Sequence, residues 1–221
     1  MNAKVNPISD FKDKSLSINI AILGEPKCGK TSLINCYLYN TIEEGNCETV
    51  LNIQQKRVYI QNFEININFF DISSNFKRDK DLIIEYLKYS NIILLCHSLE
   101  RDFSEENFAF WLEQIEQKAE SGKTLVYIVG CKYDQKVMMD YQGGFNTTTL
   151  MFKNGNLASF GERVKNFINS NMIKEYFLVS SLLNFNVKES LDSIIQDYIY
   201  EKTLEYTKRE ANKEGQGCFI F

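Results

Sequence analysis

One short motif of this 221-residue chain has the composition of an anion-binding turn. Residues 24–31 read G-E-P-K-C-G-K-T and lie between an alternating apolar run and a segment with helical spacing. Glycines let the backbone wrap around an anion with its amides pointing inward, while Lys30 supplies positive charge for β- and γ-phosphates and Thr31 a hydroxyl ligand for Mg²⁺. We therefore expect a phosphate cradle made of Gly24, Lys27, Cys28, Gly29, Lys30, Thr31 and Ser32.

Two acidic residues also follow expected strands. Asp71 ends the run I-N-I-N-F-F-D, where a carboxylate beside the phosphate loop can hold Mg²⁺, usually through water. Asp134 closes C-K-Y-D after a buried strand, and its carboxylate can accept from both N1–H and N2–H of guanine, which adenine does not offer. Lys132 can lay its methylene stem along the face of the base. Taken alone, each of these signals also fits a loop cap or an exposed charged turn.

The segments that must position these residues alternate between strand and helix patterns. The periodicities predict strands at 16–23, 56–61, 64–70, 91–96, 124–129 and 176–179. They predict helices at 31–39, 79–88, 104–118, 160–168 and 187–207, with irregular chain at 40–50, 72–78 and 135–156. This order predicts an α/β fold whose mostly parallel six-stranded sheet has helices on both faces. The G-x-x-x-x-G-K-T motif between its first strand and first helix indicates a single P-loop NTPase domain. Ligands of such sheets bind beyond the carboxyl ends of the strands.

Composition narrows the possible functions. The chain has 25 Lys and Arg against 29 Asp and Glu, a net charge of −4, which argues against nucleic-acid binding. It has no apolar run of the roughly 18 residues that cross a membrane, and its polar N-terminus is unlike a signal peptide, so we expect a cytoplasmic protein. The six dispersed cysteines and one histidine make no metal set. We expect five of the cysteines to be buried thiols, and His97 and Trp111 to belong to the core.

In their order along the chain, these motifs resemble the Ras superfamily of small GTPases, and most closely the Rho family. Thr49 lies 18 residues after Thr31 and Asp71 lies 22 after Thr49, spacings similar to those of Ras and Rho proteins. The stretch N-I-I-L-L-C-H-S-L and the S-S-L at 180–182 are similar to Rho segments. The resemblance covers about 16–206, and the 45 residues between Asp134 and Ser180 leave room for an insertion, as in Rho proteins.

The resemblance implies a molecular switch that binds GTP or GDP with Mg²⁺ and hydrolyses GTP. Thr49 would join Thr31 and Asp71 as a Mg²⁺ ligand and contact the γ-phosphate from the first switch. The base would be held by Cys131, Lys132, Asp134, Ser180, Ser181 and Leu182. Effectors, exchange factors and activating proteins would bind the switch regions of a monomer.

The segment after Asp71 departs from the family pattern, because it reads D-I-S-S-N where the family has D-T-A-G-Q. Asn75 matches the water-orienting Gln and is one methylene shorter. With Lys30 and Asn75 as the catalytic residues, we expect slow intrinsic hydrolysis. A hydrolysis-deficient, GTPase-like binding module that signals only through partners remains open. A phosphate-loop kinase is disfavoured, because the chain has only five arginines for a lid.

The C-terminal residues C-F-I-F fit the C-a-a-X motif, and the final Phe indicates geranylgeranyl transfer to Cys218. From Lys202 onward, four basic residues face three acidic ones and no second cysteine is nearby, so the second membrane signal is weak. We expect a flexible N-terminal arm at 1–14, the GTPase domain at 15–207 and a prenylated, flexible tail at 208–221. The protein would lie partly on the cytosolic face of membranes.

Overall fold

The structure is a computed structural model that describes residues 16–42, 51–60, 63–72, 76–100, 104–118, 123–134, 162–169 and 172–216. Its strands are β1 (Leu16–Gly24), β2 (Leu51–Ile60), β3 (Phe63–Ile72), β4 (Ile92–Ser98), β5 (Leu125–Cys131) and β6 (Ile173–Leu178). Its helices are α1 (Lys30–Tyr39), α2 (Phe76–Tyr89), α3 (Glu105–Lys118), α5 (Glu162–Asn169) and α6 (Val187–Gln216).

All six strands form one sheet in the order β2-β3-β1-β4-β5-β6. β2 and β3 are an antiparallel hairpin, and every other neighbouring pair is parallel. The register places Ile22 opposite Asp71, Gly24 opposite Cys96 and Ser98 opposite Cys131. The carboxyl ends of β1, β3, β4 and β5 therefore meet at one edge of the sheet, and the predicted fold class is confirmed.

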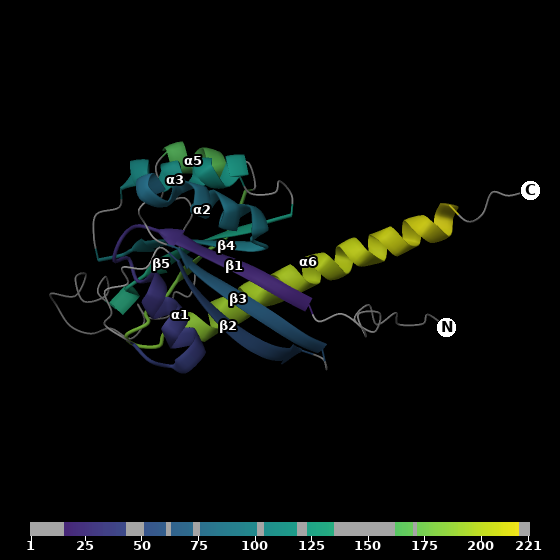
Figure 1. Ribbon diagram of the computed structural model, residues 1–221, viewed down its shortest axis with the longest axis horizontal. Helices are drawn as coiled ribbons and strands as arrows, with labels where there is room; N and C mark the ends of the chain where they lie inside the picture. The colour runs from purple at the N-terminus through teal and green to yellow at the C-terminus, as the bar shows by residue number, and fades with distance from the viewer. Residues whose placement is uncertain are drawn as a thin grey trace, which may run out of the picture.

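Helices cover both faces of this sheet, with α2, α3 and α5 on one side and α1 and α6 on the other (Figure 1). Each helical layer closes a separate apolar core. Alternating β1 residues enter the two cores, since Ile20 and Ile22 lie in the α1–α6 core and Ala21 and Leu23 in the α2–α3–α5 core. β4 is buried along its whole length, as expected for a central parallel strand.

Several element boundaries differ from the sequence predictions. β2 begins at Leu51 rather than near residue 56, because backbone pairing with β3 holds an edge strand whose Ile53 stays half exposed. α2 begins at Phe76, inside the stretch predicted as a loop. α6 continues to Gln216, so the flexible tail predicted from residue 208 is wrong over these nine positions. The Lys, Arg, Glu and Ala residues of this stretch favour helix even where the helix has no apolar face. A prediction from apolar periodicity depends on such a face.

The predicted N-cap of α3 and several predicted core residues are confirmed. Ser104 caps α3 through the bond from the Asn107 amide to its Oγ, at 3.4 Å. His97 and Trp111 are buried. Among the cysteines, Cys28, Cys36, Cys96 and Cys131 are free and buried, while Cys47 lies outside the described residues.

Within the described part of the chain, no helix combines the length and the apolar character needed to cross a membrane.

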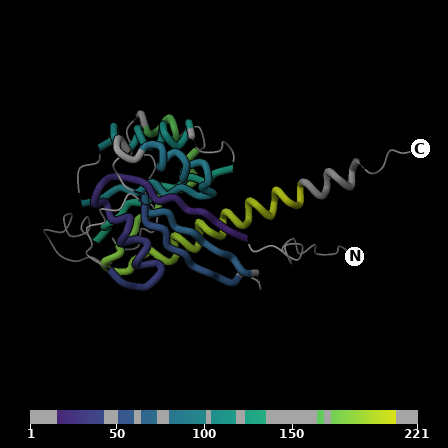
Figure 2. The backbone as a smooth tube through the Cα atoms, in the orientation of Figure 1, coloured from purple at the N-terminus to yellow at the C-terminus, as the bar shows by residue number. Residues whose placement is uncertain are grey.

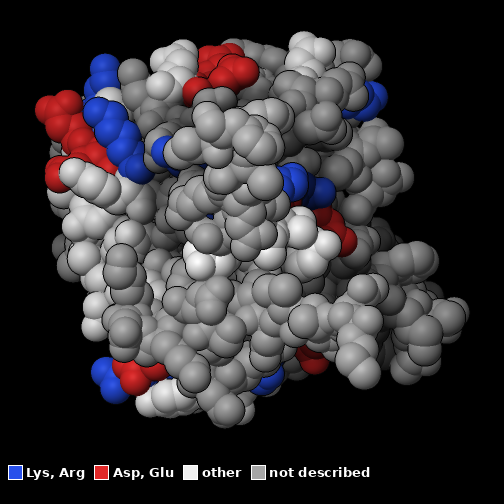
Figure 3. Space-filling view, turned by 90° about the vertical axis from the view of Figure 1, so that its right-hand side faces the viewer, with Lys and Arg blue, Asp and Glu red and all other residues white. Residues whose placement is uncertain are grey.

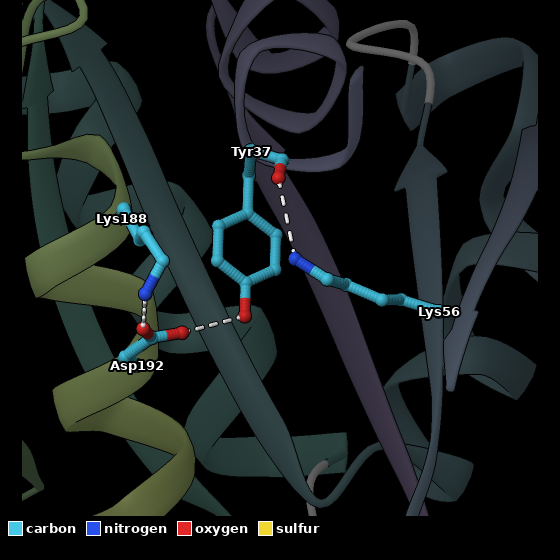
Figure 4. Close-up of polar contacts among 4 residues, drawn as sticks. All are labelled: Tyr37, Lys56, Lys188 and Asp192. Carbon is cyan, nitrogen blue, oxygen red and sulfur yellow. Dashed lines mark hydrogen bonds and ion pairs between the residues drawn. The ribbon is translucent and has the colours of Figure 1, made fainter. Parts of the chain in front are cut away.

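A polar network joins α1 to α6 and β2 (Figure 4). The buried Tyr37 hydroxyl donates to Asp192 Oδ1 at 2.8 Å, and Lys188 holds the other carboxylate oxygen of Asp192 at 2.6 Å. Lys56 Nζ lies 3.8 Å from the centre of the Tyr37 ring and donates to the Tyr37 carbonyl at 3.4 Å. Burial, with the hydrogen bond to Asp192, raises the pKa of Tyr37, and burial lowers the pKa of Lys56. The phenol therefore remains a neutral donor at neutral pH.

We predict that Tyr37→Phe lowers the free energy of unfolding by about 1 kcal/mol. The hydroxyl contact is lost, but Asp192 keeps Lys188 and the ring keeps its edge contact with Phe69. Urea unfolding followed by circular dichroism measures the change. Tyr200→Phe, at an exposed position of α6, is the matched control and should have no effect. Equal stability of Tyr37→Phe and the unmutated protein would contradict the role of the network.

Candidate functional site

The phosphate loop connects β1 to α1 at the carboxyl edge of the sheet (Figure 2). Gly24 has φ +135° and Gly29 has φ +111°, values that L side chains rarely adopt. A Cβ at position 24 would lie 1.9 Å from the Cys96 carbonyl oxygen, so only glycine fits there. Gly29 caps α1 without a side-chain hydrogen bond to the first turn, which leaves helix amides available to an anion.

Lys30 and Lys27 give the loop its charge and its shape. Lys30 is buried, and its ammonium donates to the carbonyls of Gly24 at 3.2 Å and Glu25 at 2.8 Å. Both acceptors are uncharged, so a positive charge is held against the inside of the turn. Lys27 adopts φ +58°, a conformation uncommon for a residue with a side chain. The loop thus has the backbone turn and the cation that a phosphate group requires.

A hydroxyl and a carboxylate meet beside the loop. Thr31 Oγ1 donates to Asp71 Oδ2 at 2.5 Å, joining the first turn of α1 to the end of β3. Burial raises the pKa of Asp71, opposed by the Thr31 hydrogen bond and the charge of Lys30. A cation beside this carboxylate would offset the cost of burying its charge. Oxygen donors of these two types suit Mg²⁺, so the residues present fit that ion.

The C-K-Y-D motif lies at the same edge, directly after β5. Asp134 is buried, and Ser180 donates to its Oδ1 at 2.5 Å. The Tyr133 amide donates to the Val179 carbonyl at 3.0 Å, which holds the motif against the chain leaving β6. Lys132 has φ +61°, and its ammonium forms an ion pair with Glu100 at 2.6 Å. The structure thus brings Asp134 and Ser180 together from widely separated parts of the chain.

The S-S-L turn is held from two sides. Ser180 pairs with Phe185 in an isolated antiparallel bridge, and its Oγ accepts the Leu183 amide at 3.1 Å. The Cys36 thiol of α1 lies 3.6 Å from the Ser181 carbonyl and 3.3 Å from Asn184 Oδ1. Leu182 is exposed at the tip of the turn. A segment predicted to contact the base is therefore anchored to the helix that follows the phosphate loop.

Three buried thiols lie close to the loop. Cys28 Sγ is 3.6 Å from the Cys96 carbonyl, and the Cys96 and Cys131 thiols share a hydrogen bond. Burial raises the pKa of Cys28 to about 12, although the charge of Lys30 opposes the shift. The hydrogen bond with Cys131, together with burial, raises the pKa of Cys96. The Cys28 and Cys96 thiols therefore stay protonated at neutral pH, so Cys28 can serve a ligand through backbone and packing rather than as a nucleophile.

Three predicted site residues, Thr49, Asn75 and Cys218, lie outside the described residues. Within the described ranges, Glu100 is the residue at this edge that sequence reasoning missed. It follows β4, and β4 is the neighbour of β5, so knowledge of the strand order would have placed it beside C-K-Y-D. Periodicity along the chain contains no such information.

The arrangement can bind a phosphorylated ligand with a divalent cation at one end and a base at the other. A backbone cradle with a buried ammonium lies after β1, an oxygen pair suited to Mg²⁺ lies between α1 and β3, and an oriented carboxylate lies after β5. β1 is flanked by β3 on one side and β4 on the other, a reversal of strand order where ligands of α/β sheets bind.

Comparison with known proteins shows the family of this chain. A family model described as the Ras family matches residues 19–200, so the chain belongs to the Ras family. The Rho-related protein racI of Dictyostelium discoideum is 25% identical over 188 residues, covering 84% of this chain and 88% of that protein. The Ras-like GTP-binding protein RYL2 of Yarrowia lipolytica is 24% identical over 122 residues, covering 55% of this chain and 57% of that protein. Members of this family are GTPases that bind GTP and GDP, generally with Mg²⁺.

Proposed function

We propose that this Ras-family protein is a Rho-like, membrane-associated switch that cycles between GDP and GTP. The observation that carries the proposal is the gathering, at one edge of the sheet, of the phosphate loop, the Thr31–Asp71 pair and the Ser180-oriented Asp134. These three parts match, in turn, the phosphates, the Mg²⁺ ion and the base of a magnesium-bound guanine nucleotide. The likeness to a Rho-related protein supports the Rho-like assignment.

In this proposal the phosphates lie in the cradle of Gly24, Lys27, Cys28, Gly29, Lys30, Thr31 and Ser32. Backbone amides at the start of α1 would donate to phosphate oxygens, and Lys30 would exchange part of its contact with the loop carbonyls for a phosphate oxygen. Thr31 and Asp71, with Thr49, would hold Mg²⁺, which when bound neutralises phosphate charge. A Thr49 that contacts the γ-phosphate would be released when that group leaves, and this order–disorder step is the switch.

The base would lie between Lys132 and the S-S-L turn. Asp134 would accept the N1–H and N2–H of guanine, and its bond from Ser180 holds the carboxylate in a fixed orientation before the base arrives. Cys131, Ser181 and Leu182 would complete the wall of the base site through backbone and packing. This donor–acceptor pattern selects guanine, because adenine presents no matching pair of donors.

We predict that Asp134→Ala lowers the affinity for GTP by an order of magnitude or more, since charged hydrogen bonds contribute about 1.5–3 kcal/mol each. Competition of GTP and ATP against fluorescent GDP measures both the affinity and the base preference. Asp192→Ala removes a carboxylate that faces α1 rather than the site, and serves as the control with unchanged base preference. Equal binding of ATP and GTP by the unmutated protein would end the guanine assignment.

Hydrolysis would proceed by in-line attack of water on the γ-phosphate, with Lys30 stabilising the charge that develops there. Asn75 would orient the water. Its side chain is one methylene shorter than the Gln of the family pattern, and a misplacement of about 1 Å can cost about a hundredfold in rate. We therefore propose slow intrinsic hydrolysis, and rapid hydrolysis only when an activating protein completes the site.

We predict that Asn75→Gln raises the single-turnover rate of GTP hydrolysis, measured by phosphate release from preloaded protein. Asn75→Ala is the companion variant and should lower the rate below that of the unmutated protein. An unchanged or lower rate in Asn75→Gln would show that Asn75 does not position the water. If no hydrolysis occurs even with an activating protein, the chain is instead the binding module that its D-I-S-S-N segment also suggests.

Membrane attachment would depend on a prenyl group at Cys218. The motif C-F-I-F begins two residues beyond the end of α6, so a lipid there would connect to the domain through a helix rather than a long flexible tail. On the side of the molecule from which α6 emerges, the described basic and acidic side chains lie beside one another, without a face of one sign (Figure 3). One prenyl chain without a polybasic partner supports reversible attachment.

We predict that the unmutated protein divides between membranes and cytosol, and that Cys218→Ser makes it wholly cytosolic. A single myristoyl chain binds membranes on the order of 10⁴ M⁻¹, and the longer prenyl chain should bind more strongly without becoming irreversible. Fractionation of cells expressing each form measures the distribution. Cys47→Ser is the control and should keep the divided distribution. Continued sedimentation of Cys218→Ser with membranes would assign the attachment to another surface.

A further inference from the structure

Glu100 forms an ion pair with Lys132 at the carboxyl edge of the sheet. The Lys132 ammonium lies 2.6 Å from Glu100 Oε2, and the two side chains are 31% and 36% exposed. The pair joins the second residue after β4 to the first residue after β5, and these two strands are neighbours in the sheet. It therefore extends the contact between the strands beyond the last ladder hydrogen bonds.

The backbone on both sides of the pair is held in place. The Leu99 amide donates to the Cys131 carbonyl at 2.9 Å, and the Glu100 amide donates to Ser98 Oγ at 3.2 Å. Lys132 leaves β5 with φ +61°, which turns the chain at the point where its side chain meets Glu100. The backbone of both residues is thus held in place. The Glu100 carboxylate then selects one position of the Lys132 ammonium.

The ion pair that holds the Lys132 ammonium also restricts the methylene stem of the same side chain. A lysine side chain has many rotamers, and ordering them opposes binding when it has to happen together with the ligand. Glu100 orders the stem beforehand, next to the buried Asp134 that the Ser180 hydroxyl orients. A base that stacks against the stem then meets a surface that is already formed.

We propose that Glu100 is a positioning residue for nucleotide retention, which holds the stem of Lys132 against the face of the guanine base through their ion pair. The inference rests on the proposed function, since it requires guanine in this site. Glu100 would act through Lys132 on the release rates of both GDP and GTP.

The experiment measures release of fluorescent GDP and of a fluorescent non-hydrolysable GTP analogue from purified full-length protein. Glu100→Gln should speed release about two- to fivefold, the range that a partly exposed ion pair supports. The acceleration should be equal for GDP and the GTP analogue, because the pair acts on the base and not on the phosphates. Glu100→Asp, which keeps the charge, should restore much of the slower release.

A double-mutant cycle with Lys132→Met tests the mechanism directly, because methionine keeps an apolar stem and removes the charge. In the Lys132→Met background, Glu100→Gln should have no further effect. Added salt should speed release from the unmutated protein and have less effect on Glu100→Gln, since salt screens a partly exposed pair. Glu201→Gln breaks the exposed Lys174–Glu201 pair, 3.3 Å long and formed between β6 and α6, and should release nucleotide at the unmutated rate.

Two outcomes would overturn the inference. Release from Glu100→Gln at the unmutated rate would show that the pair does not position Lys132 for the base. Equal acceleration by Glu100→Gln in the presence and absence of the Lys132 charge would show that Glu100 acts only on the stability of the loop. In both cases the unmutated protein still retains guanine nucleotide. Failure of the unmutated protein to retain any guanine nucleotide would instead overturn the proposed function, and this inference with it.

Discussion

The close approach of Gly24 to the backbone of β4 constrains everything else at the site. A side chain at this position would overlap the Cys96 carbonyl, and the φ of +135° excludes most residues independently. β1 can therefore end between β3 and β4 and pass directly into a tight loop. The position of that exit places Lys30 inside the turn, Thr31 against the end of β3, and the first amides of α1 at the carboxyl edge.

The site contains two buried residues that can carry charge, Lys30 and Asp71. Lys30 is held by neutral carbonyls, and Asp71 is held by a hydroxyl while its pKa is raised by burial. Burying charges in this way opposes folding of the empty domain. A phosphate beside Lys30 and a divalent cation beside Asp71 would add an opposite charge at each residue. Ligand binding and stability of this edge are therefore coupled, as expected where any ligand binds the native state alone.

The C-terminal helix connects the candidate nucleotide site with the proposed lipid attachment. Tyr37 of α1 bonds Asp192, and Tyr127 of β5 bonds Asp197 at 3.1 Å, so α6 is fixed to the helix that follows the phosphate loop and to a central strand. Asn40 and Asn184 add a third link, at 2.7 Å, between the end of α1 and the turn after Ser180. A lipid attached just beyond α6 would set the orientation of the domain on a membrane through these contacts.

The sequence by itself determined the elements and the chemistry of the phosphate loop, because both depend on residues close together in the chain. Apolar periodicity located every strand and helix that the structure describes, and G-E-P-K-C-G-K-T carried its own strand–turn–helix context. Apolar periodicity failed at the start of β2, where backbone pairing with β3, and not burial, holds the chain. It failed again at the end of α6, where helix propensity continues without an apolar face.

Only the tertiary structure decided which distant residues meet. Thr31 and Asp71 are 40 positions apart, Asp134 and Ser180 are 46 apart, and Glu100 and Lys132 are 32 apart. Each pair forms because particular strands are neighbours in the order β2-β3-β1-β4-β5-β6. Family resemblance had placed the members of each of the first two pairs in one predicted site, without predicting that they contact each other. The third pair rests on a Glu that matches no motif, and its role emerges because parallel neighbours place the residues after their carboxyl ends side by side.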